Sequence, residues 1–171
     1  WREDDGSIMQ LVLFIGFSGI VALVFRHRIV VLIGIALSLR VFIPSVAAVA
    51  VTGVSNEGQI QPASYFLMIT FIVSLGTCGA AMAQEVKRHR WLYLIFASVF
   101  FSSLVVTGSL RPPVSTAVLI DTLGCGILLC LLVRTAITKD EKNGTRIAHV
   151  FLALAASQGA IAILQRATQS T

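Results

Sequence analysis

The apolar run IVVLIGIAL, residues 29–37, decides the fold of this chain. It has neither the alternation of apolar and polar residues that a membrane-spanning strand would show nor a charged residue. The run LVLFIGF, residues 11–17, has the same character. Backbone N–H and C=O groups in lipid must be satisfied within their own segment, which favours helices over strands. The sequence therefore predicts helices that lie in a membrane.

The composition of the whole chain extends this prediction from two runs to the complete sequence. Of its 171 residues, 56% are hydrophobic and only 12% are charged, whereas a soluble domain averages about 25% charged residues. This balance argues against a soluble domain and excludes a disordered chain. Six apolar segments, each long enough to cross a core about 30 Å thick, occupy residues 8–25, 29–54, 62–84, 91–108, 113–133 and 147–165.

We therefore expect an all-α fold: a polytopic transmembrane bundle of six spanning helices, with residues 1–171 forming one domain. No linker or tandem repeat divides the sequence. Because it begins with Trp1 rather than methionine, we also expect it to be a fragment of a larger membrane protein. No secretory signal peptide is evident, since the first five residues carry three acids and one base.

The basic residues predict the orientation of the bundle. Cytoplasmic loops carry an excess of Lys and Arg, and the stretches after the first, third and fifth segments hold nine of the thirteen bases. The opposite side holds Arg2, Arg111 and Arg166. Both ends of the sequence are thus expected outside, and the basic loops are expected beside anionic lipid rather than nucleic acid. The nine bases are Arg26, Arg28, Lys87, Arg88, Arg90, Arg134, Lys139, Lys142 and Arg146.

Arg40 is the one base inside an apolar segment. A charge near mid-bilayer costs about 2.5–3.5 kcal/mol on insertion scales and normally faces the bundle interior, a wet cavity or an anionic partner. Two interpretations follow: Arg40 contacts a lipid phosphate or an acidic substrate, or it pairs with an acid of the chain. Pro44, one turn later, is expected to kink the helix.

Asp121 is the natural candidate for that acid. It lies eight residues into the fifth segment, a depth of about 12 Å, against about 21 Å for Arg40 below Val54. The long arginine side chain can reach toward the interface, and pairing would relieve two desolvation costs at once. We predict an Arg40–Asp121 ion pair or a shared polar cavity.

Polar and small residues also recur at helical spacing. Gln158, Ala162, Gln165 and Gln169 share one face of the last segment, where they either bond a neighbouring helix or line a substrate groove. Small residues of the third segment are expected to permit close helix packing. They are Gly76, Gly79, Ala80 and Ala83.

No catalytic, cofactor-binding or metal-binding motif appears in the sequence. Cys78, Cys125 and Cys130 lie within apolar segments with no His or acid at ligand spacing, and they are interpreted as small apolar residues. We therefore assign no catalytic residue and no metal ligand. Arg40, Asp121, Gln158 and Gln165 are the candidate substrate-binding residues.

The order of features resembles the membrane region of the O-antigen ligase and polymerase family. The resemblance rests on Leu39–Pro44, followed by the re-entry at Gln61–Tyr65, and on the basic stretch Arg134–Arg146, which leads into the aliphatic helix 147–165. It implies the N-terminal half of a membrane glycosyltransferase of the bacterial inner membrane. Such enzymes transfer glycans from an undecaprenyl diphosphate carrier on the periplasmic side. The family's catalytic Arg and His lie further along and match no position here, so none is assigned.

Two other classes of protein remain open. Half of a secondary transporter would contain helices broken near mid-bilayer, for which Pro44 is the only candidate. A non-catalytic membrane scaffold would use Arg40 and Asp121 as a purely structural pair.

Overall fold

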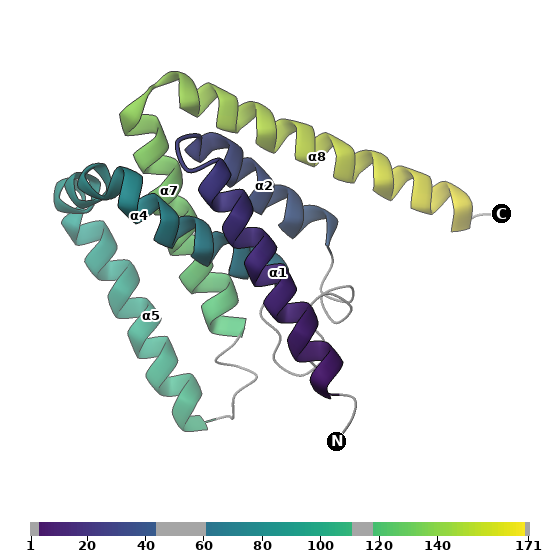
Figure 1. Cartoon of the computed structure of the whole chain (residues 1–171), viewed down its shortest axis with the longest axis horizontal. Helices are drawn as coiled ribbons and strands as arrows, with labels where there is room; N and C mark the ends of the chain where they lie inside the picture. The colour runs from purple at the N-terminus through teal and green to yellow at the C-terminus, as the bar shows by residue number, and fades with distance from the viewer. Residues whose placement is uncertain (1–3, 44–60, 111–117, 170–171) are drawn as a thin grey trace.

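The structure, a computed structural model, describes residues 4–43, 61–110 and 118–169. Within these ranges the chain forms six α-helices and one π-helical turn, and no strand, which confirms the all-α prediction. The elements (Figure 1) are α1 (Asp4–Val24), α2 (Ile29–Phe42), α4 (Pro62–Arg88), α5 (Arg90–Leu110), η1 (Ile120–Gly124), α7 (Cys125–Lys139) and α8 (Lys142–Gln169).

Helix α4 is the centre of the bundle. It packs most extensively on α7 and also contacts α1 and α2, whereas α5 makes few contacts with it. Helix α8 packs on α2 and α7, and its C-terminal part extends away from the other helices (Figure 1). The inward face of α4 follows the three-to-four-residue spacing of an amphipathic helix. That face comprises Phe66, Leu67, Thr70, Ser74, Cys78, Met82 and Glu85, all buried.

The core combines aliphatic side chains from α1, α2, α7 and α8 with the inward face of α4. Leu32 and Ile33 of α2 and Leu132 and Ala136 of α7 are fully buried. Burying an aliphatic side chain of this size stabilises a fold by about 1.5–3 kcal/mol when water is the alternative. The large apolar side chains of α1, α5 and α8 instead point outward, among them Phe17, Leu94 and Leu152. An apolar exterior of this extent is typical of a surface that faces lipid.

Three helices are long and apolar enough to cross a membrane: Pro62–Arg88, Ile120–Lys139 and Lys142–Arg166. This length and composition support a membrane protein. The other apolar helices in the described ranges are shorter, at Leu11–Val24, Ile29–Phe42 and Arg90–Val106. Of the six expected spans, three are therefore both long and apolar enough within the described residues.

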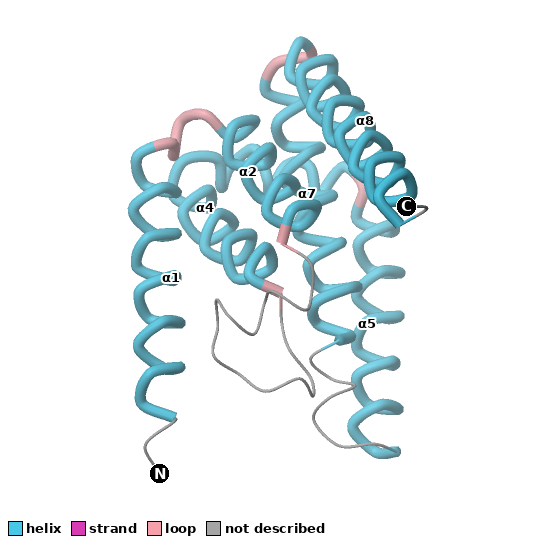
Figure 2. Tube along the Cα trace, turned by 90° about the vertical axis from the view of Figure 1, so that its right-hand side faces the viewer, coloured by secondary structure: helices cyan, strands magenta, loops and turns pink. Residues whose placement is uncertain are grey.

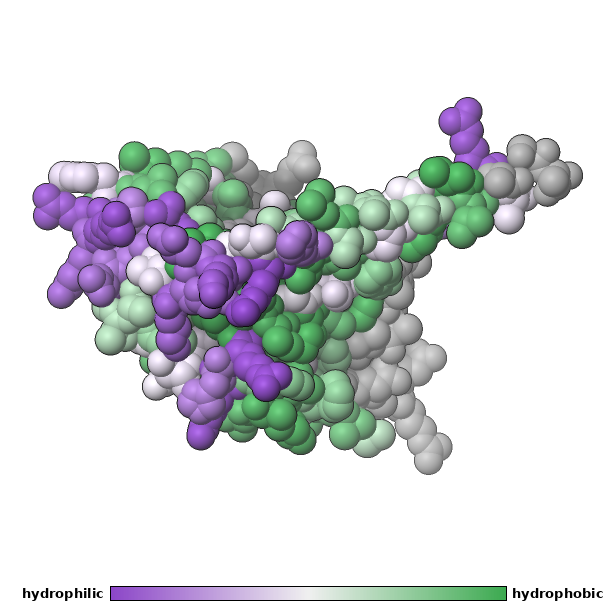
Figure 3. Space-filling view, turned by 90° about the horizontal axis from the view of Figure 1, so that it is seen from above, coloured by the Kyte–Doolittle hydropathy of each residue, from purple (hydrophilic) through white to green (hydrophobic). Residues whose placement is uncertain are grey.

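The three turns that connect α1 to α2, α4 to α5 and α7 to α8 lie toward the same end of the bundle (Figure 2). Seen from that end, hydrophilic side chains gather over these turns, while apolar residues cover much of the rest (Figure 3). The predicted basic stretches therefore share one end, which we call the basic end.

Two helix boundaries differ from the sequence prediction. Helix α2 ends at Phe42, where Ile43 is extended, so the helix expected over residues 29–54 with a kink at Pro44 is instead interrupted before that proline. Pro44, the predicted kink, lies outside the described residues. The stretch from Arg134 to Arg146 was expected to be a loop, but α7 continues to Lys139 and α8 begins at Lys142.

The small residues of α4 do not pack as expected. Gly76, Ala80 and Ala83 are exposed, and a side chain built on Gly76 or Gly79 would meet no atom within 4 Å. The buried face of α4 instead carries Thr70, Ser74 and Cys78. Among the residues that the structure describes, the prediction of close helix contact through this stripe is therefore wrong.

Candidate functional site

The first polar cluster forms where η1 begins the helix that α7 continues. A π-helical turn inserts one extra residue per turn, and such turns occur frequently at functional sites. Here the turn spans Ile120–Gly124 and carries Asp121, whose side chain is only 8% exposed. A buried carboxylate needs partners for both oxygens, and three groups supply them.

These three groups come from α2 and from the start of α4. Asp121 Oδ1 accepts hydrogen bonds from the Gln61 backbone N–H at 3.0 Å and the Ser64 hydroxyl at 2.5 Å. Asp121 Oδ2 forms an ion pair with Nη2 of Arg40 at 3.2 Å. Nη1 of the same arginine donates to Ser64 Oγ at 3.3 Å. We call Arg40, Gln61, Ser64 and Asp121 the Asp121 cluster.

Helix dipoles favour both charges of this cluster. Arg40 lies in the last turn of α2, where the partial negative charge of a helix C-terminus favours a cation. Asp121 accepts the N–H of Gln61, the N-cap residue of α4, whose own side chain makes no capping bond. A carboxylate beside free N–H groups at a helix start is stabilising. Asp121 thus caps α4 from another helix.

The predicted Arg40–Asp121 ion pair is confirmed. It joins α2 to the start of α7, with Ser64 of α4 between them. The space around Arg40 is small, a cavity of about 20 Å³, which is close to the room that one water needs. The Arg40 side chain is nevertheless 39% exposed.

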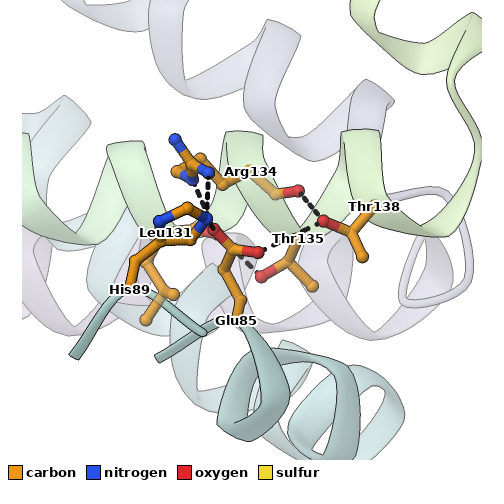
Figure 4. Close-up of polar contacts among 6 residues, drawn as sticks. All are labelled: Glu85, His89, Leu131, Arg134, Thr135 and Thr138. Carbon is orange, nitrogen blue, oxygen red and sulfur yellow. Dashed lines mark hydrogen bonds and ion pairs between the residues drawn. The ribbon is translucent and has the colours of Figure 1, made fainter. Parts of the chain in front are cut away.

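A second polar cluster lies toward the basic end, and the sequence analysis missed it. Glu85 of α4 has a side chain only 1% exposed. Its carboxylate accepts a hydrogen bond from Arg134 Nε and one from the Thr138 hydroxyl at 3.3 Å (Figure 4). His89 Nε2 lies 2.6 Å from Arg134 Nη2 and 3.5 Å from Glu85 Oε1. We call these four residues the Glu85 cluster.

Arg134 therefore has a different role from the one predicted. It was assigned to a basic loop beside lipid, but it lies in α7 and pairs with a buried acid. The sequence did carry a signal for this pair: Glu85 follows an apolar segment directly and stands four residues before His89. The neighbouring Lys87, Arg88 and Arg90 made the stretch resemble an ordinary basic loop.

The two clusters tie α4 to α7 at both ends of their contact. At the start of α4, an acid contributed from η1 accepts its hydrogen bonds. At the end of α4, its own Glu85 binds Arg134 and Thr138 of α7. The two helices consequently run in the same direction, with α5 as the connection between them in the chain.

The glutamine face of α8 is only partly engaged. Gln158 Nε2 donates to the Val41 carbonyl at 2.8 Å, next to Arg40. Gln165 is exposed, on the part of α8 that extends away from the bundle (Figure 1). The side chain of Gln169 lies outside the described residues. Of the candidate substrate-binding residues, Arg40 and Asp121 thus pair directly, Gln158 bonds the backbone next to Arg40, and Gln165 does not join them.

Replacing Gln158 with alanine is expected to loosen α8 from α2, because the bond to Val41 is lost. A hydrogen bond of this kind contributes about 0.5–1.5 kcal/mol, so amide hydrogen exchange in the middle of α8 should accelerate roughly threefold to tenfold. The exposed Gln165→Ala serves as the matched control and should leave exchange unchanged. Equal protection in both variants would show that the Gln158 bond does not hold the helix.

The described side chains include no candidate metal site and one contact of a cysteine with a base. No group of three or more His, Cys, Asp or Glu residues in the described ranges is placed to hold a metal ion. The nearest contact of a cysteine with a base is Lys139 Nζ to Cys78 Sγ, at 3.4 Å. No protein-family model, curated protein or solved structure matches this chain. Its function therefore has to be argued from the two clusters and the surfaces around them.

Proposed function

We propose that this chain is the carrier-binding membrane region, the N-terminal half, of a bacterial polysaccharide ligase or polymerase. The reaction would transfer a glycan from an undecaprenyl diphosphate carrier at the outer face of the inner membrane. In this proposal Arg40 contacts the diphosphate of the carrier, and the residues that perform the transfer lie elsewhere in the protein.

The observation that supports the proposal is the state of the Arg40 guanidinium. It is held in place by Asp121 and Ser64, yet its side chain remains 39% exposed. A guanidinium has five N–H donors in a fixed fork, and that fork matches the geometry of phosphate oxygens. An arginine oriented in advance loses less conformational entropy when it binds an anion.

An apolar groove near the Asp121 cluster suits the prenyl chain of such a carrier. A cavity of about 370 Å³ lies between α5 and the α4–α7 pair, with an entirely apolar lining. Its lining includes Met68, Phe100, Ile120 and Leu128, and Ile120 is the neighbour of Asp121 in the π-helical turn. Because α5 packs loosely on the bundle, the groove could widen to admit a chain.

A membrane scaffold is the second candidate function, and one observation favours it. Asp121 neutralises Arg40 directly, so the pair can be explained by the cost of burying either charge alone. The two proposals differ for a variant in which Asp121 is replaced by a neutral residue. Arg40 then still binds the carrier diphosphate in the first proposal and has no binding role in the second.

Binding of undecaprenyl diphosphate to the chain in phosphatidylcholine nanodiscs separates the two proposals. Arg40→Gln/Asp121→Asn removes both charges and leaves the net charge unchanged, whereas Asp121→Asn removes only the acid. If Arg40 binds the diphosphate, the double variant should lose at least about tenfold in affinity, as expected when a charge-assisted hydrogen bond is removed.

The single variant is the control for this measurement. Asp121→Asn keeps the cation and should bind the carrier as tightly as the unmodified chain or more tightly. Circular dichroism would establish that both variants remain helical. Equal carrier binding by all three proteins would reject the carrier-binding role and leave the scaffold.

A further inference from the structure

An open pocket of about 470 Å³ lies at the basic end, where the α1–α2 turn meets the α7–α8 turn. Its polar lining comes from two parts of the chain that are distant in sequence. Neither the Asp121 cluster nor the Glu85 cluster contributes to it. The polar side chains that line it are His27, Arg28, Lys139, Asp140, Asn143 and Arg146.

Basic groups outnumber acidic ones in this pocket. Arg28, Lys139 and Arg146 line the pocket together with one acid, Asp140, whose Oδ2 lies 4.0 Å from Arg146 Nη1. The Lys139 ammonium also donates to Cys78 Sγ. One oxygen of Asp140 already has a partner, because Oδ1 accepts a hydrogen bond from the backbone N–H of Lys142 at the start of α8. Asn143 Oδ1 accepts a bond from Arg146 Nη1 at 3.1 Å and so holds this arginine at the pocket.

The start of α2 adds to the positive potential. Residues 29–31, its first turn, line the pocket. The N-cap residue Arg28 makes no side-chain capping bond, and the first turn holds no acid. The N–H groups of a helix start carry a partial positive charge, and the residues of this first turn line the same pocket as the three bases.

The surroundings of the pocket point to a lipid as its ligand. Its lining continues from the bases to Ile29, Val30 and Val31, and Val31 is exposed. Hydrophilic side chains gather at this end, with apolar residues beside them (Figure 3). Basic pockets between membrane helices on the cytoplasmic side are typical sites for anionic head groups. We infer that this pocket binds the phosphate of an anionic phospholipid, whose acyl chains lie against α2.

The test is a native mass spectrometry titration of the detergent-solubilised chain with dioleoyl phosphatidylglycerol. Phosphatidylcholine with the same acyl chains and soluble glycerol 3-phosphate serve as the comparison ligands. We expect phosphatidylglycerol to bind at least tenfold more tightly than phosphatidylcholine. Glycerol 3-phosphate at the same concentration should not displace it.

Matched charge variants locate the site. A base near a lipid phosphate contributes about fivefold in affinity, so Arg28→Gln/Arg146→Gln should weaken phosphatidylglycerol binding roughly 25-fold. Lys87→Gln/Arg88→Gln removes two exposed bases of the same end that do not line the pocket, and should change affinity less than about twofold. Asp140→Asn removes the only acid lining the pocket, retains a capping side chain, and should tighten binding.

Three results would overturn the inference. One is equal binding of phosphatidylglycerol and phosphatidylcholine by the unmodified chain. Another is equal weakening by the two double variants, which would show a general surface charge effect. The third is displacement of the lipid by glycerol 3-phosphate, which would show that the pocket takes a free phosphate.

Discussion

Replacing Arg134 with alanine is expected to lower the free energy of unfolding by about 3 kcal/mol. The substitution leaves the carboxylate of Glu85, whose side chain is 1% exposed, without its principal cation. Removing one partner of a buried ion pair typically costs about 3–5 kcal/mol. The lower end applies here because the Arg134 side chain is 39% exposed and water already shares its charge. Equilibrium unfolding in mixed micelles would measure the loss.

Two further variants control this experiment. Arg146→Ala breaks an exposed contact with Asp140, the two side chains being 62% and 46% exposed, and a hydrogen bond to Asn143 at the open pocket, and should cost no more than about 1 kcal/mol. Glu85→Gln/Arg134→Gln removes both charges and should recover most of the stability lost in Arg134→Ala. A loss in Arg134→Ala no larger than that in Arg146→Ala would mean that the Glu85 cluster does not stabilise the bundle.

Replacing Arg40 with alanine should produce the second largest effect, a loss of about 2–3 kcal/mol. Asp121 would remain buried with a full charge, but it would keep the hydrogen bonds from Gln61 and Ser64. These two bonds are the reason to expect a smaller loss than the usual cost of a broken buried pair. Unfolding in micelles again supplies the measurement.

Two variants, Arg40→Lys and Arg28→Ala, are the controls for Arg40→Ala. Arg40→Lys should lose about half as much as alanine, because an ammonium cannot reproduce the two fork contacts to Asp121 and Ser64. Arg28→Ala changes an exposed base at the other end of α2 and should be nearly neutral. A neutral Arg40→Ala would contradict the assigned role of the cluster.

The Arg40–Asp121 pair could be predicted from the sequence because an unpaired charge inside a membrane is costly in free energy. Each residue is an isolated charge well inside an apolar segment, and each needs a partner. Glu85 and Arg134 escaped prediction because they stand at the edges of their segments, where unpaired charges are ordinary. Only the three-dimensional packing of α4 on α7 shows that Glu85 is buried.

The boundaries and faces of the helices were harder to predict. Apolar composition continues well beyond Phe42, so the prediction gave Pro44 only a kink, although the residue before a proline disfavours the helical conformation and Ile43 is extended. The π-helical turn that directs Asp121 inward has no signal of its own in the sequence. Small residues at helical spacing indicate a possible contact, but on α4 the side chains buried beside them are Ser74, Cys78 and Met82, and no atom lies within 4 Å of a side chain built on either glycine.

Asp121 and Arg40 hold together α2, α4 and the helix formed by η1 and α7 through a direct interaction. A double-mutant cycle with Arg40→Ala, Asp121→Ala and the combined variant measures this interaction free of the other effects of each change. We predict a coupling of at least about 1 kcal/mol, within the range found for contacting residues. A coupling below about 0.3 kcal/mol, so that the two single effects simply add, would contradict the account.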